Sequence, residues 1–255
     1  MRQKPKKLRV GSFDFTPATF SDATRTIVEI IQKTNDAEKG TSIHFANANN
    51  IALAENDASY QNTINVGDLV FTDGVPVVCA AKRIHPQDKW ERVYGPDVTE
   101  WILSSPELSE TAKPYSLGAT QETMEKLLKK IATRFPRAQV VSHYCPPFHE
   151  PTAQALTEHD QRIKDAGATV VWVGLGTPKQ GREVNRYAET SNVTAMAVGA
   201  AFDFLAEPVP QAPVWIEKSG SEWGYRLVRE AKRLAKRYFW GNPQFIKSVI
   251  PHWGN

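Results

Sequence analysis

The segment best suited to bind an anion is Gly174-Leu-Gly-Thr-Pro-Lys-Gln180, which follows a predicted strand and opens a predicted helix. Gly174 and Gly176 allow the backbone to approach a ligand closely, and the first N–H groups of a helix are free to donate to it. Thr177 adds a hydroxyl and Lys179 adds a positive charge. The spacing matches neither a Walker A loop nor a dinucleotide fingerprint. We predict a nucleotide or anion site here; a tight strand-to-helix turn with a solvated lysine is the alternative.

A carboxylate that could act as a general base stands at the end of another predicted strand. Asp73 follows Thr72 and precedes Gly74, so a sheet would hold its backbone while the side chain faces a cleft. Removal of a proton from a sugar hydroxyl would require partial desolvation of this carboxylate. The alternative is an Asp-Gly turn whose side chain only bonds local backbone, and the dipeptide by itself favours that alternative.

Three asparagines follow a third predicted strand. Asn47, Asn49 and Asn50 offer amide donors and acceptors that suit a ligand rich in hydroxyl groups. The other possibility is that they cap the helix predicted to begin near Ile51, and we expect at least one of them to do only that.

Two further loops have the same form, a strand followed by a glycine and a polar residue. The first contains Gly118, in Tyr115-Ser-Leu-Gly-Ala-Thr120. The second contains Asp203, in Val198-Gly-Ala-Ala-Phe-Asp203. We therefore include Gly118 and Asp203 among the candidate binding residues.

The elements that must position these loops alternate between short β-rich runs and helical patterns. Strands are predicted at residues 8–13, 42–46, 68–72, 115–117, 139–143, 169–174 and 194–198, and helices at 120–134, 153–166 and 178–190. This alternation predicts an α/β fold: a Rossmann-like, mostly parallel sheet with helices on both faces. Ligands of such sheets bind beyond the carboxyl ends of the strands, where the candidate loops stand.

The C-terminal part differs in composition from the rest of the chain. Three prolines within residues 208–213 separate a core of residues 1–205 from an appendage of residues 206–255. From Val214 to Asn255 there are eight Lys/Arg and three Asp/Glu, so this segment has a net charge of +5. Since the whole chain has a net charge of +3, the residues before Val214 carry −2. Residues 222–240 form a basic amphipathic helical pattern. Such a helix can lie on an anionic membrane, bind a diphosphate through its arginines, or simply pack on the core.

The composition and motifs of the sequence also argue against several classes of protein. No stretch approaches the ~20 apolar residues of a membrane span, and the lysine-rich start has no signal-peptide core, so we expect a cytoplasmic protein. Cys79 and Cys145 indicate no disulfide framework, and neither has metal-ligand neighbours. A Gly-x-Ser-x-Gly elbow is missing, which disfavours a serine hydrolase.

Taken in order, these loops resemble the WecG/TagA/CpsF family of glycosyltransferases from about Thr26 to Phe245. The resemblance rests on Asn47 followed by Ile51-Ala-Leu-Ala, Leu69-Val-Phe-Thr-Asp-Gly74, Arg92-Val-Tyr-Gly-Pro-Asp97, Leu117-Gly118, Pro146-Pro-Phe148, Val173-Gly-Leu-Gly-Thr-Pro-Lys-Gln180, Val198-Gly-Ala-Ala-Phe-Asp203, Ala212-Pro213, Glu222-Trp-x-Tyr-Arg226, Arg237-Tyr238 and Gly241-Asn-Pro-x-Phe245. Each fragment is weak alone, but the ordered set is specific.

The resemblance implies transfer of a sugar from a UDP-sugar to a polyprenyl-diphosphate-linked sugar, with inversion and without a metal or other cofactor. It implies that Asp73 deprotonates the acceptor hydroxyl and that Gln180 lines the same pocket. The appendage is implied to sit at the inner face of the cell membrane, where Arg226, Arg229 and Arg233 would reach the donor diphosphate. The product would serve cell-envelope or exopolysaccharide synthesis, and an oligomer is possible.

The chain departs from the family pattern at two positions. The family usually has Glu after Pro-Lys-Gln, whereas Gly181 stands here, so a contact in that loop is lost or moved. A threonine commonly stands two residues before Asn47, whereas this chain has Phe45, which leaves donor and acceptor identity open.

Two other function classes compete with the transferase hypothesis. One is a nucleotide-binding module whose basic tail docks on nucleic acid, although the tail's cations lie on one helix and the rest is net acidic. The other is a Rossmann oxidoreductase, which lacks the Gly-x-Gly-x-x-Gly motif in context. The sequence therefore favours the transferase hypothesis over both of these classes.

Overall fold

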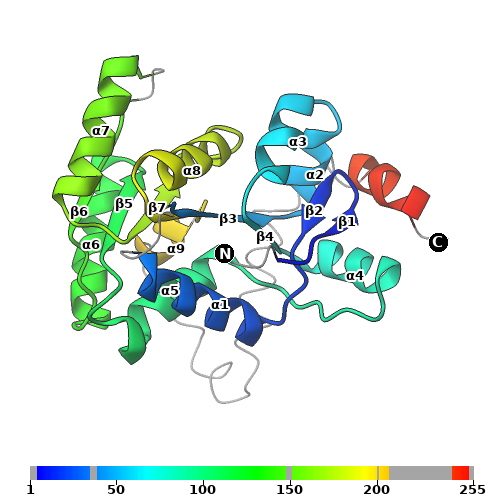
Figure 1. The fold of residues 1–255 in the computed structure, drawn as a ribbon, viewed down its shortest axis with the longest axis horizontal. Coiled ribbons are helices and arrows are strands. Elements are labelled where there is room, and N and C mark those ends of the chain that lie inside the picture. Colours follow the sequence, from blue (N-terminus) through cyan, green and yellow to red (C-terminus); the bar gives the residue numbers. More distant parts are fainter. Residues whose placement is uncertain (1–4, 35–38, 148–150, 200, 207–242, 253–255) are drawn as a thin grey trace, which may run out of the picture.

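The computed structural model describes residues 5–34, 39–147, 151–199, 201–206 and 243–252. Its centre is a six-stranded sheet in the order β4-β3-β8-β7-β5-β6, in which every pairing is parallel (Figure 1). The strands are β3 (Thr41–Ala46), β4 (Leu69–Thr72), β5 (Pro114–Gly118), β6 (Ser142–Tyr144), β7 (Val170–Gly174) and β8 (Thr194–Ala197). The predicted α/β class is therefore confirmed.

Side chains alternate between the two faces of the central strands, and each face has its own core. On β7, Val170 and Trp172 join one apolar cluster, while Val171 and Val173 join another. All four are fully buried. A strand covered on both faces reads as a continuous apolar run, which is why Val170-Val-Trp-Val173 carries no polar position.

Four helices cover the first face of the sheet. They are α1 (Phe20–Gln32), α5 (Gly95–Ser104), α6 (Gln121–Arg134) and α9 (Ala201–Ala206). Their apolar residues pack on that face in one cluster, as Met124, Leu127 and Ile131 of α6 do. The predicted helix at 120–134 is confirmed with Thr120 as its N-cap, whose side chain accepts from the Thr123 N–H.

The second face has two groups of helices. The helices α7 (Ala153–Asp165) and α8 (Lys179–Thr190) cover β5 and β7, close to their predicted bounds. Three others gather at the β3 and β4 end: α2 (Ala48–Ala54), α3 (Ala58–Asn65) and α4 (Val75–Ile84). Helices therefore lie on both faces, as predicted.

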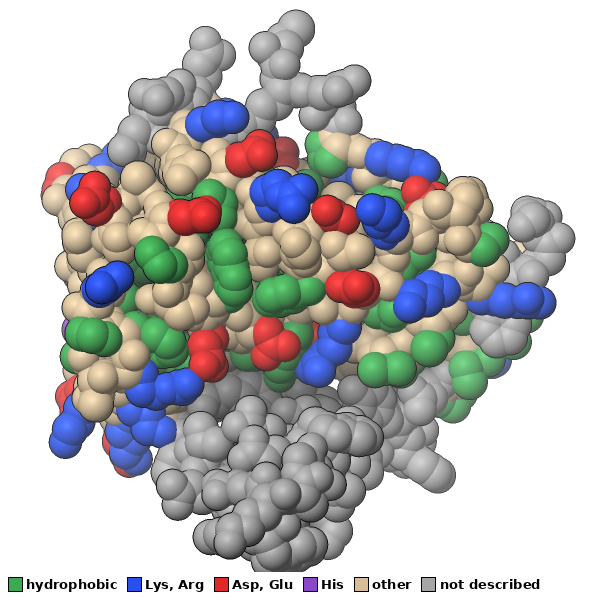
Figure 2. All heavy atoms as spheres, turned by 90° about the horizontal axis from the view of Figure 1, so that it is seen from below, with side chains coloured by type: hydrophobic (Ala, Val, Ile, Leu, Met, Phe, Trp, Pro, Cys, Tyr) green, Lys and Arg blue, Asp and Glu red, His purple; other side chains and the backbone are tan. Residues whose placement is uncertain are grey.

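Charges of both signs are interspersed over the described surface in Figure 2. Several form exposed ion pairs, such as Arg134 with Glu100 at 2.6 Å. Exposed pairs of this kind contribute little to stability because solvent screens them. The mixture of charges does, however, mean that the described residues on the face seen in Figure 2 do not form a patch of one sign.

The prediction of a single strand at residues 8–13 is wrong. The chain instead forms an antiparallel hairpin of β1 (Leu8–Val10) and β2 (Phe13–Phe15), separate from the main sheet. Gly11 has a φ of 59°, and this left-handed conformation, easy for glycine, reverses the chain. Leu8 and Val10 before the turn and Phe13 after it favour one continuous strand when the sequence alone is considered.

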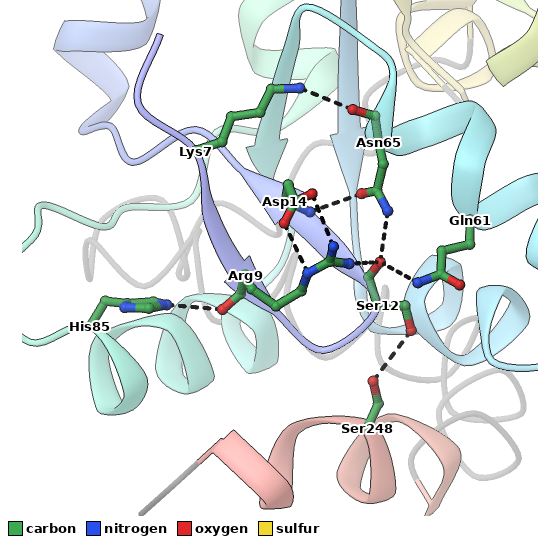
Figure 3. Close-up of polar contacts among 8 residues, drawn as sticks. All are labelled: Lys7, Arg9, Ser12, Asp14, Gln61, Asn65, His85 and Ser248. Carbon is green, nitrogen blue, oxygen red and sulfur yellow. Dashed lines mark hydrogen bonds and ion pairs between the residues drawn. The ribbon is translucent and has the colours of Figure 1, made fainter. Parts of the chain in front are cut away.

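Polar side chains fix this hairpin to the helices beside it (Figure 3). The carbonyl oxygen of Ser12 accepts hydrogen bonds from Arg9 at 2.6 Å, Gln61 at 3.0 Å and Asn65 at 3.1 Å. Asn65 also accepts from the backbone N–H of Asp14 at 2.9 Å. Since Gln61 and Asn65 belong to α3 or its end, the hairpin turn and α3 are held as one unit.

Residues 243–249 are helical and pack on the same unit. Phe245 and Val249 are buried in the cluster that contains Val10 and Ile51. Ser248 donates a 2.7 Å hydrogen bond to Glu55, and Glu55 also accepts from Ser12. The predicted division into residues 1–205 and 206–255 stays a prediction, but the last part of that appendage is packed on the core. The basic amphipathic pattern at 222–240 lies outside the described residues.

A buried histidine connects β3 to α8. His44 is 1% exposed, and its Nε2 lies 2.8 Å from Oδ1 of Asn185, while Asn185 donates to the carbonyl of Thr63 at 2.7 Å. Burial lowers the pKa of His44 to about 4, and the hydrogen bond to Asn185 only partly opposes it. The folded protein therefore holds this imidazole neutral.

We predict that His44 makes the fold sensitive to mild acid. A folded-state pKa of about 4, below the ordinary 6.5, means that the unfolded chain binds a proton first as the pH falls. Stability is then lost between pH 6.5 and pH 4. Urea unfolding should show about 2 kcal/mol more loss from pH 7 to pH 5 in the wild type than in His44→Gln. An equal loss of stability from pH 7 to pH 5 in the wild type and in His44→Gln would contradict the prediction.

Candidate functional site

The predicted site residues come from five loops that meet at one edge of the sheet. Because all six strands are parallel, the loops that follow β4, β3, β8, β7 and β5 leave from the same side. Asp73 and Gly118 mark the two ends of this row. Four interstrand spacings of about 4.8 Å put these ends about 19 Å apart. The edge is thus long enough for an extended ligand rather than a single small ion.

Asp73 lies between the end of β4 and the start of α4. Its backbone N–H donates to the Ala46 carbonyl at 2.9 Å, so the loops after β4 and β3 begin side by side. The side chain is half-buried. Gly74 is the N-cap of α4, and a Cβ added there would lie 3.8 Å from Cβ of Asn47. The Asp-Gly dipeptide is therefore a strand-to-helix junction next to Asn47.

Thr72 is fully engaged in holding this junction. Its hydroxyl donates to the Glu91 carbonyl at 2.8 Å, and its own carbonyl accepts from the Val93 N–H at 2.8 Å. The side chain is 2% exposed. These bonds fix the segment around residues 91–93 against the end of β4, so Thr72 supports Asp73 from behind.

Asn47 and Asn50 cap α2, as we expected of at least one asparagine. The side-chain oxygen of Asn47 accepts from the N–H groups of Asn49 and Asn50, and the Asn50 oxygen accepts from the Asn47 N–H at 2.9 Å. This reciprocal arrangement is a capping box. A ligand contact by Asn47 would use its amide nitrogen, because the cap engages the oxygen.

Gly118 and Gly174 bring two strand ends together. They are paired in the register of β5 and β7, and a Cβ added at Gly118 would lie 2.4 Å from the Gly174 carbonyl oxygen. Gly118 also has a φ of 126°. A Cβ added at Gly174 would meet the ring of Phe202 at 2.7 Å. The two glycines are thus required by backbone and ring contacts, whatever ligand binds.

The loop after β7 reaches across β8 toward α2. Asn50 donates to the hydroxyl of Tyr60 at 2.8 Å and to the hydroxyl of Thr177 at 3.4 Å. Lys179 begins α8 and is half-buried. The structure therefore brings Thr177 next to the asparagine loop, although the two are far apart in the sequence.

Gln180 carries an acceptor that is buried without a partner among the described residues. Its Oε1 is inaccessible to solvent and makes no hydrogen bond there. Its Nε2 points toward the loop after β8, 3.8 Å from where a Cβ of Gly199 would lie. A buried carbonyl oxygen without a donor costs free energy, so a ligand hydroxyl that donates to it would be stabilised.

A small apolar groove of about 50 Å³ adjoins this edge, beyond the ends of β5 and β6. Its walls include Leu117, Tyr144, Leu175, Lys179 and Tyr187. The ring of Tyr144 meets that of His159 edge-on with centroids 4.0 Å apart. Burial and the nearby arginines lower the pKa of His159, so its imidazole favours the neutral form.

Sequence reasoning missed this groove. The strand predicted at 139–143 ends one residue before Tyr144, whereas β6 runs from Ser142 to Tyr144. Tyr144 stands at the carboxyl end of its strand, a place that corresponds to that of Asp73 after β4. This position was the signal in the sequence that could have indicated a binding residue.

The remaining candidates are placed only in part. Asp203 lies in α9, and Arg226, Arg229 and Arg233 lie outside the described residues. Among the residues that the structure describes, no three His, Cys, Asp or Glu side chains gather as a metal site would require.

The two departures from the family pattern have structural explanations. Phe45 is buried and stacks on Phe71, with ring centroids 6.1 Å apart, so it belongs to the core of the sheet. Gly181 is buried beneath α3, where an added Cβ would lie 3.3 Å from both Ile64 and Thr63. A glutamate side chain would not fit at position 181 without a shift of α3.

The chain belongs to the glycosyl transferase WecG/TagA/CpsF family, whose profile matches residues 8–254. This match covers nearly the whole chain, including every candidate site residue. The protein is therefore a glycosyltransferase with a Rossmann-like α/β fold.

We predict that Gly118→Ala distorts the edge of the sheet. The new Cβ would collide with the Gly174 carbonyl, and the backbone would also be strained at φ 126°. The free energy of unfolding, measured in urea, should fall by about 3 kcal/mol or more. Gly167→Ala is a matched control, since Gly167 also has a positive φ of 62° but has no atom within 4 Å of an added Cβ. Gly167→Ala should lower the free energy of unfolding by only about 1 kcal/mol. Equal losses of stability in the two variants would show that the close approach of Gly118 to Gly174 is unimportant.

Proposed function

We propose that this glycosyltransferase transfers a sugar from a UDP-sugar to a polyprenyl-diphosphate-linked sugar, with inversion and without a metal ion. The observation that supports this most is the position of Asp73. Asp73 is half-buried and precedes Gly74, where an added Cβ would lie 3.8 Å from Cβ of Asn47, at the edge where the loops after the parallel strands meet. Ligands of parallel α/β sheets bind at this edge. The family supplies the reaction class, and we assign the role of base to the carboxylate at this edge.

In the proposed reaction, Asp73 takes the proton from the acceptor hydroxyl as that oxygen attacks the anomeric carbon. The bond from this carbon to the donor diphosphate breaks, and UDP leaves with the negative charge. Inversion follows because the acceptor attacks from the face opposite UDP. One base and one stabilised leaving group are sufficient for this chemistry.

The leaving diphosphate requires positive charge in place of a metal ion. Lys179 begins α8, and the positive end of the dipole of this helix lies at the glycine loop after β7. Arg226, Arg229 and Arg233 would add guanidinium groups, which form paired hydrogen bonds to phosphate. We therefore assign the nucleotide to the loops of Gly118, Gly174, Gly176, Thr177 and Asp203, and the acceptor to the Asp73 end.

Gln180 fits between these two ends. Its buried Oε1 lacks a donor among the described residues, and a sugar hydroxyl would provide one. Asn47, through its amide nitrogen, and the backbone at Gly74 would contact the same sugar. This assignment gives the polar groups near Asp73 a partner rich in hydroxyl groups, which agrees with a sugar substrate.

We further propose that the protein works at the inner face of the cell membrane in envelope or exopolysaccharide synthesis. None of the helices that the structure describes is long and apolar enough to cross a bilayer. A lipid-linked acceptor is presented at the membrane surface, and the basic pattern at 222–240 suits an anionic surface. Docking on nucleic acid is the alternative role of that segment, and on the face seen in Figure 2 the described charges of both signs are interspersed rather than gathered in a broad basic patch.

Asp73→Ala should abolish turnover and leave UDP binding intact. Loss of a general base lowers the rate by about 10²- to 10⁴-fold. Release of UDP from UDP-sugars in the presence of a short-chain prenyl-diphosphate glycoside measures turnover, and calorimetry measures UDP binding. Asp165→Asn, at an exposed aspartate of α7, is the control and should keep full activity. Retained turnover in Asp73→Ala would remove this residue from the role of base.

Replacement of Arg226, Arg229 and Arg233 by Gln should weaken binding to anionic vesicles about 100-fold, since each cation near such a surface contributes about 1 kcal/mol. Substitution is preferable to truncation, because a truncated chain would lose Phe245 and Val249 from the core. The control removes the same charge from exposed core positions, by Arg25→Gln, Lys33→Gln and Lys129→Gln. Unchanged vesicle binding in the first variant, or equal loss in both, would contradict the membrane role.

A further inference from the structure

Tyr60 places a buried hydroxyl between two loops of the candidate site. Its side chain is 5% exposed, and its hydroxyl accepts a 2.8 Å hydrogen bond from Asn50. The same amide nitrogen of Asn50 also donates to the hydroxyl of Thr177 at 3.4 Å. Asn50 belongs to the cap that holds Asn47, and Thr177 belongs to the loop after β7. One phenol thus connects the acceptor end of the site to the nucleotide end.

The helix that carries Tyr60 is fixed on three sides. Asp57 caps α3 by accepting from the Tyr60 N–H at 2.9 Å. The ring of Phe13 in the hairpin meets the Tyr60 ring edge-on, with centroids 6.1 Å apart. On the third side, Gly181 of α8 lies so close that an added Cβ would be 3.7 Å from Cε2 of Tyr60. The ring therefore has little freedom to move away from the two loops.

Glycine at position 181 permits this close packing. An added Cβ would lie 3.3 Å from both Ile64 and Thr63, tighter than side chains normally pack, so even alanine would press on α3. Gly181 directly follows Gln180, and Gln180 donates its N–H to the Gly176 carbonyl at 2.9 Å. The start of α8 and the loop before it are therefore positioned against α3.

Hydrogen-bond chemistry requires Tyr60 to remain a neutral phenol. Burial raises its pKa to about 12, so the proton stays on the hydroxyl at physiological pH. A hydroxyl can donate once and accept at the same time. The neutral hydroxyl accepts from the Asn50 amide, and this amide also reaches the hydroxyl of Thr177.

We propose that Tyr60 is a positioning residue, which sets the distance between the Asn47–Asp73 end of the site and the Gly174–Gln180 loop by holding the Asn50 amide that also donates to Thr177. It acts through these residues and touches no substrate itself. The consequence for the reaction rests on the proposed function. A base on one loop and a leaving group on another react efficiently only at the correct separation, and a displacement of about 1 Å can cost 100-fold in rate.

Hydrogen exchange tests the positioning without reference to any reaction. Tyr60→Phe removes the hydroxyl and keeps the ring that packs on Phe13. The amides of residues 175–181 should then exchange at least about tenfold faster than in the wild type, since these residues lose an anchor. Tyr115→Phe is the matched control: Tyr115 is 3% exposed in β5 and lies toward the amino end of that strand, away from the site. It should leave exchange of residues 175–181 unchanged.

Steady-state kinetics test the consequence. At a temperature where all variants are folded, Tyr60→Phe should lower kcat/KM for the donor by roughly 10- to 100-fold, and Tyr115→Phe should leave it within twofold. Thr177→Val should show a similar loss, and the double variant Tyr60→Phe/Thr177→Val should be no worse than the poorer single variant. Such non-additivity is expected of residues that act through one shared contact.

The outcomes separate this inference from the proposed function. Unchanged exchange in Tyr60→Phe would overturn the positioning role, and so would faster exchange with full activity. Additive losses in the double variant would show that Tyr60 does not act through Thr177. If the wild type transfers no sugar to a lipid-linked acceptor while exchange responds as expected, the proposed substrates are wrong and the positioning of the loop stands.

Discussion

The backbone hydrogen bonds between parallel strands are the interaction on which the rest of this structure depends. They align the six strands so that Asp73, Asn47, Gly199, Gly174 and Gly118 all emerge at one edge. A side chain from any one of these loops would be an ordinary turn or cap residue in isolation. The alignment converts them into neighbours, and the continuous apolar cores on both faces keep the strands from sliding.

Several candidate residues have a structural task and a proposed chemical task together. Asn47 caps α2, Thr72 holds the segment near Glu91, and Gly174 accommodates the ring of Phe202. These tasks reduce the freedom of the loops, and a site works best when its supporting groups are already in place before the ligand binds. Gln180 differs from them, because its buried oxygen has no donor among the described residues.

The hairpin of β1 and β2 contacts the helical residues 243–249, although the two segments stand near opposite ends of the sequence. The hydroxyls of Ser12 in the hairpin and Ser248 near the C-terminus lie 3.3 Å apart (Figure 3). Glu55 accepts a hydrogen bond from each of them. Phe245 and Val249 fill the same apolar cluster as Phe13 and Ile51. Both α9 and the helical residues 243–249 therefore pack on the core.

The sequence by itself determined the α/β class, most of the strands and the loops that carry Asp73, Asn47 and Gln180, because each strand, glycine and helix start leaves a local pattern. It did not reveal the Gly11 turn, the groove beside Tyr144 or the hydroxyl of Tyr60. Only the tertiary structure decided the strand order, and with it the approach of Thr177 to Asn50 across 127 positions of the chain. Such contacts arise from the packing of whole helices on a sheet, and packing at long range has no periodicity that can be read along the chain.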